Sequence, residues 1–238
     1  MRYLDSATFD FMEMLNFYER PFRAKFIPAK VWKDLDNYRN DGKGLSNYFK
    51  KWRTKVEFRP EPTNSKTYKE YVAAGGEYDP NERQCALHIY STNFDKHKFS
   101  DKSWNKFKYR IIQIQMHELV HFMQYDRRSD IWHNYVVPFK KVQQEKKNLE
   151  RKYLSEFDEI QAYAHCVYMD FKTHRPNIPV EELLSRAKDY KDSKTLHYFL
   201  KTFDYDFKNN VAIPKIMQQV MKWDRKYQRA QRASRKPK

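Results

Sequence analysis

The sequence predicts a mostly helical α+β fold, in which a small N-terminal mixed sheet precedes a helical C-terminal half. The first observation is that all four glycines lie before residue 77, so the following 162 positions contain no glycine. Apart from proline, glycine is the residue that most weakens a helix. The second is that the short segments with strand character gather between residues 55 and 90. The chain has 17% aromatic residues, enough for a sizeable core, and no Gly/Ser-rich linker interrupts it.

Helices are expected before the strands. Residues 5–19 have apolar positions at helical spacing and end before Pro21. Pro28 fits the start of a second helix that runs to Tyr38. After a break at two glycines, a third helix is expected over 45–52.

Three strands are expected next. Residues 55–59 alternate polar and apolar side chains, as a half-buried strand does. A second strand over 68–74 would turn at Gly75-Gly76, and a third would cover 86–90. An exposed sheet edge can receive an extended peptide, and the 86–90 strand is the candidate for that role.

The rest of the chain is expected to be helical. Asp101 or Ser103 can cap a long helix that runs to about residue 126. Ser155-x-x-Asp158 resembles a capping box and would start a helix that runs to Phe171. Further helices are expected at 138–149, 180–190, 194–205 and 215–231. The expected organisation is a helical segment 1–54, a core 55–175, C-terminal helices 176–221 and a basic tail 222–238, forming one compact domain plus the tail.

The net charge is +16, and its densest part is the C-terminus, where residues 222–238 hold eight Lys or Arg and one Asp. Such a tail favours nonspecific contact with nucleic acid, because no base-reading motif accompanies it. No run of 18 apolar residues occurs, so no membrane span is expected. The N-terminus lacks the apolar stretch of a signal peptide, which predicts a cytoplasmic protein. Cys85 and Cys166 are expected to be free thiols.

The motif that carries chemistry is His117-Glu118-Leu119-Val120-His121, which reads H-E-x-x-H within the long predicted helix. Residues four apart share a helix face, so the imidazoles of His117 and His121 can bind one Zn²⁺. Glu118 stands beside the first ligand, where its carboxylate can take a proton from an attacking water. The flanking residues are apolar, which predicts a buried helix whose polar groups need partners or a metal.

A catalytic zinc usually has three protein ligands, and this motif supplies two. The continuation H-x-x-G-x-x-H is absent, because Gln124 and Arg127 stand at its Gly and His positions. Glu159, expected in the first turn of the next capped helix, is the leading third ligand. The alternatives are Glu156, His133 and His165. Both glutamates would also be favourable near a positive helix N-terminus without binding metal.

H-E-L-V-H followed by Glu159-Ile160-Gln161-Ala162-Tyr163-Ala164 resembles the gluzincin metallopeptidases, especially their small members, over roughly residues 55–170. The resemblance implies a zincin-like core with the sheet packed on the active-site helix. It also implies His117, His121 and Glu159 as zinc ligands, with Glu118 as the general base. The N-E-x-x-S-D pattern of many relatives is absent. The short, lysine-rich, aromatic chain is also similar in style to phage-encoded members.

The expected function is a zinc-dependent endopeptidase that acts on a protein or peptide substrate, in a host cytoplasm or a virion if phage-encoded. Tyr153, expected in the loop ahead of the Glu159 helix, is the candidate stabiliser of the developing oxyanion. The alternative is a non-catalytic basic protein, structural or associated with nucleic acid, that keeps a metallopeptidase-like fold. The intact Glu118 favours chemistry, because a purely structural zinc site has no use for a base.

Overall fold

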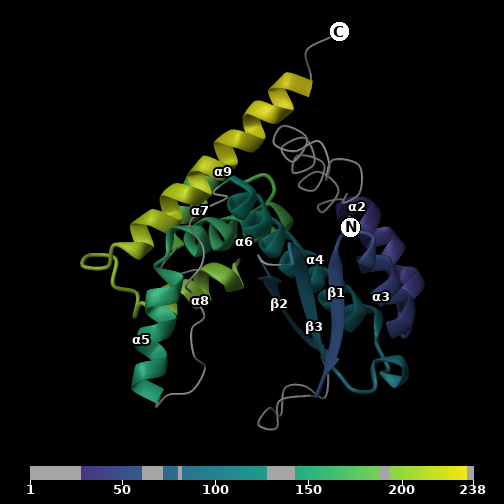
Figure 1. Ribbon diagram of the computed structural model, residues 1–238. Helices are drawn as coiled ribbons and strands as arrows, with labels where there is room; N and C mark the ends of the chain where they lie inside the picture. Colours follow the sequence, from purple (N-terminus) through teal and green to yellow (C-terminus); the bar gives the residue numbers. More distant parts are fainter. Residues whose placement is uncertain (1–27, 61–71, 80–81, 128–142, 188–192, 235–238) are drawn as a thin grey trace. The chain divides into compact units, whose positions relative to one another are not determined.

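The computed structural model describes residues 28–60, 72–79, 82–127, 143–187 and 193–234 (Figure 1). These residues form a mostly helical α+β fold, as the sequence predicts, with the strands in the N-terminal half. The chain divides into two compact units: among the described residues the first ends at Met123 and the second begins at Gln124. The helix expected at 5–19 and the candidate ligand His133 lie outside the described residues.

The first unit contains helices, one sheet and most of the long helix α4. Its elements are α2 (Pro28–Asp34), a 3₁₀ helix (Leu35–Tyr38), α3 (Gly42–Lys50), β1 (Thr54–Arg59), β2 (Ala73–Asp79), β3 (Gln84–Tyr90), a 3₁₀ turn (Phe94–Lys96) and α4 (Asp101–Arg127). Two helix starts differ from expectation. Asp41 caps α3, so Gly42 and Gly44 lie in its first turn, and the Oγ of Ser100 accepts from the backbone N–H of Ser103 at the start of α4.

The three strands form a mixed sheet in the order β1-β3-β2, with β1 parallel and β2 antiparallel to β3 (Figure 1). The expectation that the 86–90 strand lies at an exposed edge is therefore wrong, because β3 is hydrogen-bonded on both sides. Its run Ala86-Leu87-His88-Ile89 fits a central strand, in which most side chains are buried. Within the described residues, the edges of the sheet are β1 and β2.

Strand β2 runs through Gly75-Gly76, so the turn expected at these glycines is wrong. The two glycines alternate between the faces of the sheet, and Gly76 faces α4. A Cβ placed on Gly76 would lie 2.4 Å from the Cγ2 of Ile114, so strand and helix approach closely there. The rings of Tyr78 and Phe122 meet edge-on at 5.7 Å further along the same contact. Helix α4 thus packs against the sheet, as the sequence predicts.

The second unit is built around α6. Its elements are α5 (Gln143–Leu154), α6 (Phe157–His174), α7 (Val180–Ser185), α8 (Lys194–Thr202) and α9 (Ala212–Ser234), and all four other helices contact α6. The expected capping box does not form. The Oγ of Ser155 donates to the carbonyl of Arg151 at the end of α5, and Glu156 precedes α6 without a side-chain cap. Cys85 and Cys166 are both buried and form no disulfide with each other. None of the described helices is apolar and long enough to span a bilayer.

Candidate metal centre

Helix α4 holds the H-E-x-x-H motif in its C-terminal half, where apolar side chains fill most positions. Leu119 and Val120, the two residues inside the motif, are buried, and Glu118 is only 5% exposed. His117 and His121 are half-buried. The motif therefore lies, as predicted, on a continuous helix whose apolar residues are buried. Both imidazoles lie on one partly open face of this helix.

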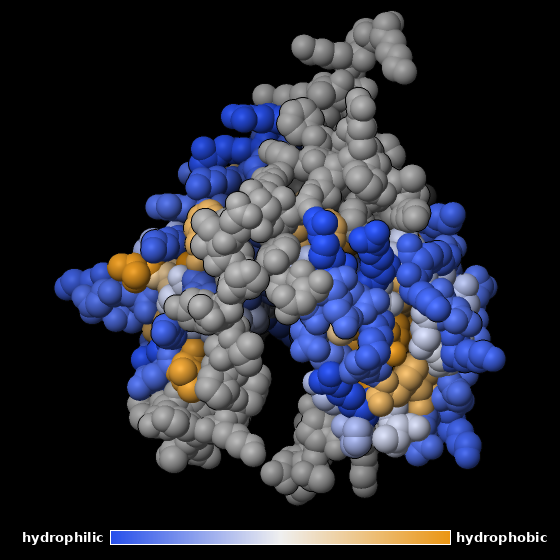
Figure 2. All heavy atoms as spheres, in the orientation of Figure 1, coloured by the Kyte–Doolittle hydropathy of each residue, from blue (hydrophilic) through white to orange (hydrophobic). Residues whose placement is uncertain are grey.

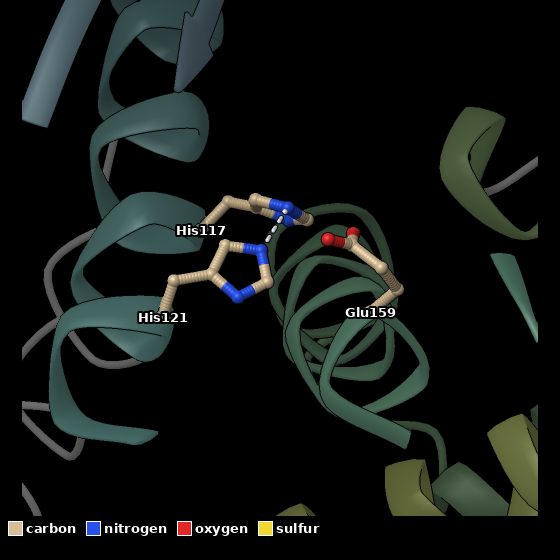
Figure 3. A group of neighbouring side chains, drawn as sticks. All are labelled: His117, His121 and Glu159. Carbon is tan, nitrogen blue, oxygen red and sulfur yellow. Dashed lines mark hydrogen bonds between the residues drawn. The ribbon is translucent and has the colours of Figure 1, made fainter. Parts of the chain in front are cut away.

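The two imidazoles converge on one point. The Nε2 atoms of His117 and His121 lie 3.1 Å apart, and their ring planes meet nearly edge-on, as Figure 3 shows. Two nitrogens bound to one tetrahedral Zn²⁺ at their usual distances would be about 3.3 Å apart. The pair is therefore already close to the spacing that a shared ion requires.

Glu159, the third residue of α6, completes the group. Its side chain is 7% exposed, and its carboxylate points toward the two imidazoles (Figure 3). One ligand atom from each of His117, His121 and Glu159 lies within 4.8 Å of the others. Two imidazoles and one carboxylate form a donor set typical of catalytic zinc sites. The three residues could thus hold a metal ion.

The two alternative ligands in the described part of the chain lie outside this group. Glu156 is the residue just before α6; burial raises the pKa of its carboxyl, and the charge of Glu159 adds to the effect. His165 is fully buried, with its Nε2 3.0 Å from the hydroxyl of Tyr227 on α9. Its ring therefore serves the packing of α9 on α6.

Glu118 lies on the sheet side of α4. A Cβ on Gly76 would come within 3.0 Å of the Oε1 of Glu118, so the missing side chain leaves room for this carboxylate. Burial raises the pKa of the Cys85 thiol on β3, and the negative charge of Glu118 raises it further. The sequence predicts neither neighbour of Glu118. The glycine pair is the available signal, but the same pair also predicts a turn.

Gln124 connects the last turn of α4 to the first turns of α6 within the second unit. Its Nε2 donates to the backbone carbonyl of Asp158 at 3.1 Å and to the Oε1 of Gln161 at 2.8 Å. Asp158 immediately precedes Glu159, and Gln124 follows His121 by three residues on one continuous helix. The sequence does not predict this role of Gln124, which stands where the longer zinc motif has glycine.

Tyr153, the expected stabiliser of the oxyanion, lies in the last turn of α5 and not in a loop. Its side chain is 38% exposed. Its catalytic role stays a prediction.

Comparisons of the chain with protein-family models, with curated proteins and with solved structures find no match.

Proposed function

We propose that the protein is a zinc-dependent endopeptidase. The observation that carries this proposal is the convergence of His117, His121 and Glu159, whose ligand atoms lie within 4.8 Å of one another. The three come from two helices, α4 and α6, and more than 35 residues separate the motif from Glu159 in the chain. These residues would hold the ion, which would polarise the scissile carbonyl and activate water when bound.

Glu118 is the proposed general base and acid. It accepts a proton from the attacking water and delivers that proton to the leaving amine. Its burial against Gly76 supports this role, because the packed surroundings hold in place the carboxylate of the residue that follows the His117 ligand. A preorganised carboxylate loses little freedom when the substrate arrives.

The substrate would be an extended segment of protein or peptide. Among the described residues, β2 is the edge strand whose Gly76 contacts Glu118. A peptide that paired with β2 would continue the sheet beside the proposed base, with main-chain hydrogen bonds supplying much of the affinity. This proposal replaces β3 with β2 as the strand that receives substrate.

The competing function is a structural zinc site in a non-catalytic protein. Such a site would close its coordination with a fourth Cys or His. Within the part of the chain that the structure describes, the group contains three residues and neither cysteine. A three-residue set leaves a position for water or substrate, which favours the catalytic role.

The test combines metal content with peptide hydrolysis. Elemental analysis of the wild type should give one zinc per chain, and Glu159→Gln should lose it. Glu156→Gln is the matched control, since it removes a neighbouring carboxylate outside the group and should keep the metal. Glu118→Gln should keep zinc and lower the rate of peptide hydrolysis by about 10²–10⁴-fold.

Two results would contradict the proposal in different ways. Retention of zinc by Glu159→Gln and its loss from Glu156→Gln would make Glu156 the ligand. A zinc-loaded wild type that cleaves nothing in a diverse peptide library would remove the peptidase activity and favour the structural role.

A further inference from the structure

Helix α9 separates its residues into two faces. One face is apolar, buried and packed along α6; it comprises Ile213, Ile216, Val220, Trp223 and Tyr227. The packing is specific as well as apolar. The indole N–H of Trp223 donates to the carbonyl of Gln161 at 3.1 Å, and the Tyr227 ring stacks on Tyr168 with centroids 4.4 Å apart. Residues 222–234, assigned to a basic tail from the sequence, thus belong to a docked helix.

The opposite face of α9 carries a cationic stripe, defined as Lys215, Lys222, Arg225 and Arg229. All four side chains are exposed, and none of them forms an ion pair with a described residue. At about 100° per residue, the four positions fall within about 80° of the helix circumference. On the face drawn in Figure 2, hydrophilic residues predominate along the course of α9, with some hydrophobic residues near its start.

The single acidic residue of α9 is turned away from this stripe. Asp224 is 6% exposed, lies 3.5 Å from the ammonium of Lys172 on α6, and accepts a hydrogen bond from the side chain of Gln228. Its negative charge is therefore paired with Lys172 inside the second unit and does not neutralise the cationic stripe. The cationic stripe keeps its full positive charge, over about 21 Å from Lys215 to Arg229.

We propose that the cationic stripe of α9 binds the phosphate backbone of double-helical nucleic acid without regard to sequence. Lys and Arg in a row neutralise phosphates and release the counterions condensed on a duplex. Single-strand binders add aromatic side chains on which bases stack, and the stripe contains none. The proposal is independent of the metal centre and goes beyond the peptidase function.

An anionic membrane is a less suitable partner. A helix that lies in a bilayer interface inserts an apolar face beside its cationic one. The apolar face of α9 is occupied by α6, and the residues between the cations on the exposed side, such as Gln218, are polar. Val211, just before α9, is exposed, but a single valine is not the apolar face that such insertion requires.

The experiment measures binding of the full-length protein to a labelled 20-base-pair duplex of random sequence over a range of salt concentrations. The stripe variant changes all four cations to Gln. A matched control changes four exposed lysines of the first unit to Gln, namely Lys33, Lys43, Lys50 and Lys102. Both variants lose the same charge, so only its position differs. Circular dichroism and thermal melting check that both are folded.

Each phosphate contact contributes about 0.9 to the slope of log K against log salt. The stripe variant should therefore have a slope shallower by about 3–4 and bind at least about tenfold more weakly at low salt, while the control stays close to wild type. Equal losses in both variants, or an unchanged slope in the stripe variant, would overturn the proposal. Tighter binding to single-stranded oligonucleotide or to phosphatidylserine vesicles at the same salt would overturn it as well. None of these readouts depends on zinc or hydrolysis.

Discussion

Helices α4 and α9 are the two longest described helices, and they differ in how far their polar side chains are buried. Helix α4 buries a series of polar side chains along its length: Ser103, Lys108, Gln113, Gln115, Glu118 and Gln124. Helix α9 buries mainly apolar residues and exposes its stripe of cations. The two proposals of function follow this difference: the proposed base lies inside the packed part of α4, and the proposed binding surface lies on the exposed side of α9.

A buried polar group destabilises a protein unless a partner satisfies it. Two buried polar residues of α4 are held by particular acceptors: Lys108 donates to Asp36, and Gln124 donates to the carbonyl of Asp158. Substituting one of these residues would therefore leave its hydrogen-bond partner unsatisfied. The exposed cations of α9 have no such ties among the described residues, so their charge can be altered with little effect on folding. Three substitutions test this contrast.

The largest effect is expected on the buried face of α9. Trp223→Ala removes a side chain that is 4% exposed, packs edge-on against His165 and donates to Gln161. Truncating a buried Trp costs about 3–5 kcal/mol. The adjacent exposed Lys222→Ala should change stability by less than about 0.5 kcal/mol. Urea unfolding followed by far-UV circular dichroism measures both.

Similar losses from Trp223→Ala and Lys222→Ala would show that α9 is not divided into a packed and a free face. Binding by the cations of residues 222–238 is therefore better tested by substituting the charges than by deleting the segment. Deletion would remove Trp223 and Tyr227 from the core of the unit along with the cations.

A somewhat smaller effect is expected at the buried lysine of α4. The ammonium of Lys108 is 2.5 Å from the Oδ1 of Asp36 and lies over the ring of Trp32, while its side chain is 1% exposed. Asp36→Ala leaves this charge without its acceptor and should cost about 2–3 kcal/mol. Half of the Asp36 side chain is exposed, so water can replace part of the interaction.

The double variant Asp36→Ala with Lys108→Met separates the charge from the packing. Methionine keeps the apolar stem of the lysine, so the double variant should be more stable than Asp36→Ala alone in the same urea experiment. If it is less stable, the ion pair is not what holds Lys108 in the interior.

The sequence was sufficient where the structure depends on local geometry. The spacing of His117 and His121 fixes their common side of a helix, and the apolar flanks fix the burial of that helix. The position of Glu159 in the first turn of α6 also followed from local signals, although the capping box at Ser155 did not form. The proximity of Glu159 to the histidines is nonlocal, and local signals alone leave Glu156, His133 and His165 as alternatives.

The sequence was insufficient where one pattern has two physical meanings. A Gly-Gly pair serves equally for a turn and for a strand that another element approaches closely. Which meaning applies at Gly75-Gly76 depends on α4, about 40 residues later. Strand order has the same origin: alternation and burial identify β3 as a strand, but its place between β1 and β2 depends on pairings with distant segments.

The smallest effect, and the most direct probe of the α4 interior, is expected in β2. Alanine at Gly76 would meet Ile114 at 2.4 Å, the Oε1 of Glu118 at 3.0 Å and the carbonyl of Ala86 at 3.2 Å. Overpacking of this kind costs about 1–3 kcal/mol. Loss of glycine's freedom in the unfolded chain offsets about 0.4–1 kcal/mol, which leaves a net cost of about 1–2 kcal/mol.

Gly75→Ala is the matched control, because its Cβ would face the other side of the sheet at 3.6 Å from the Tyr90 ring, an ordinary contact. Neither glycine has a positive φ, so the backbone accepts alanine at both positions. We expect Gly75→Ala to be neutral or slightly stabilising, with normal peptide hydrolysis. Gly76→Ala should lower both stability and hydrolysis, because Glu118 must move. Equal behaviour of the two variants would mean that Glu118 is not held by its contact with β2, and the proposed placement of the base would fail.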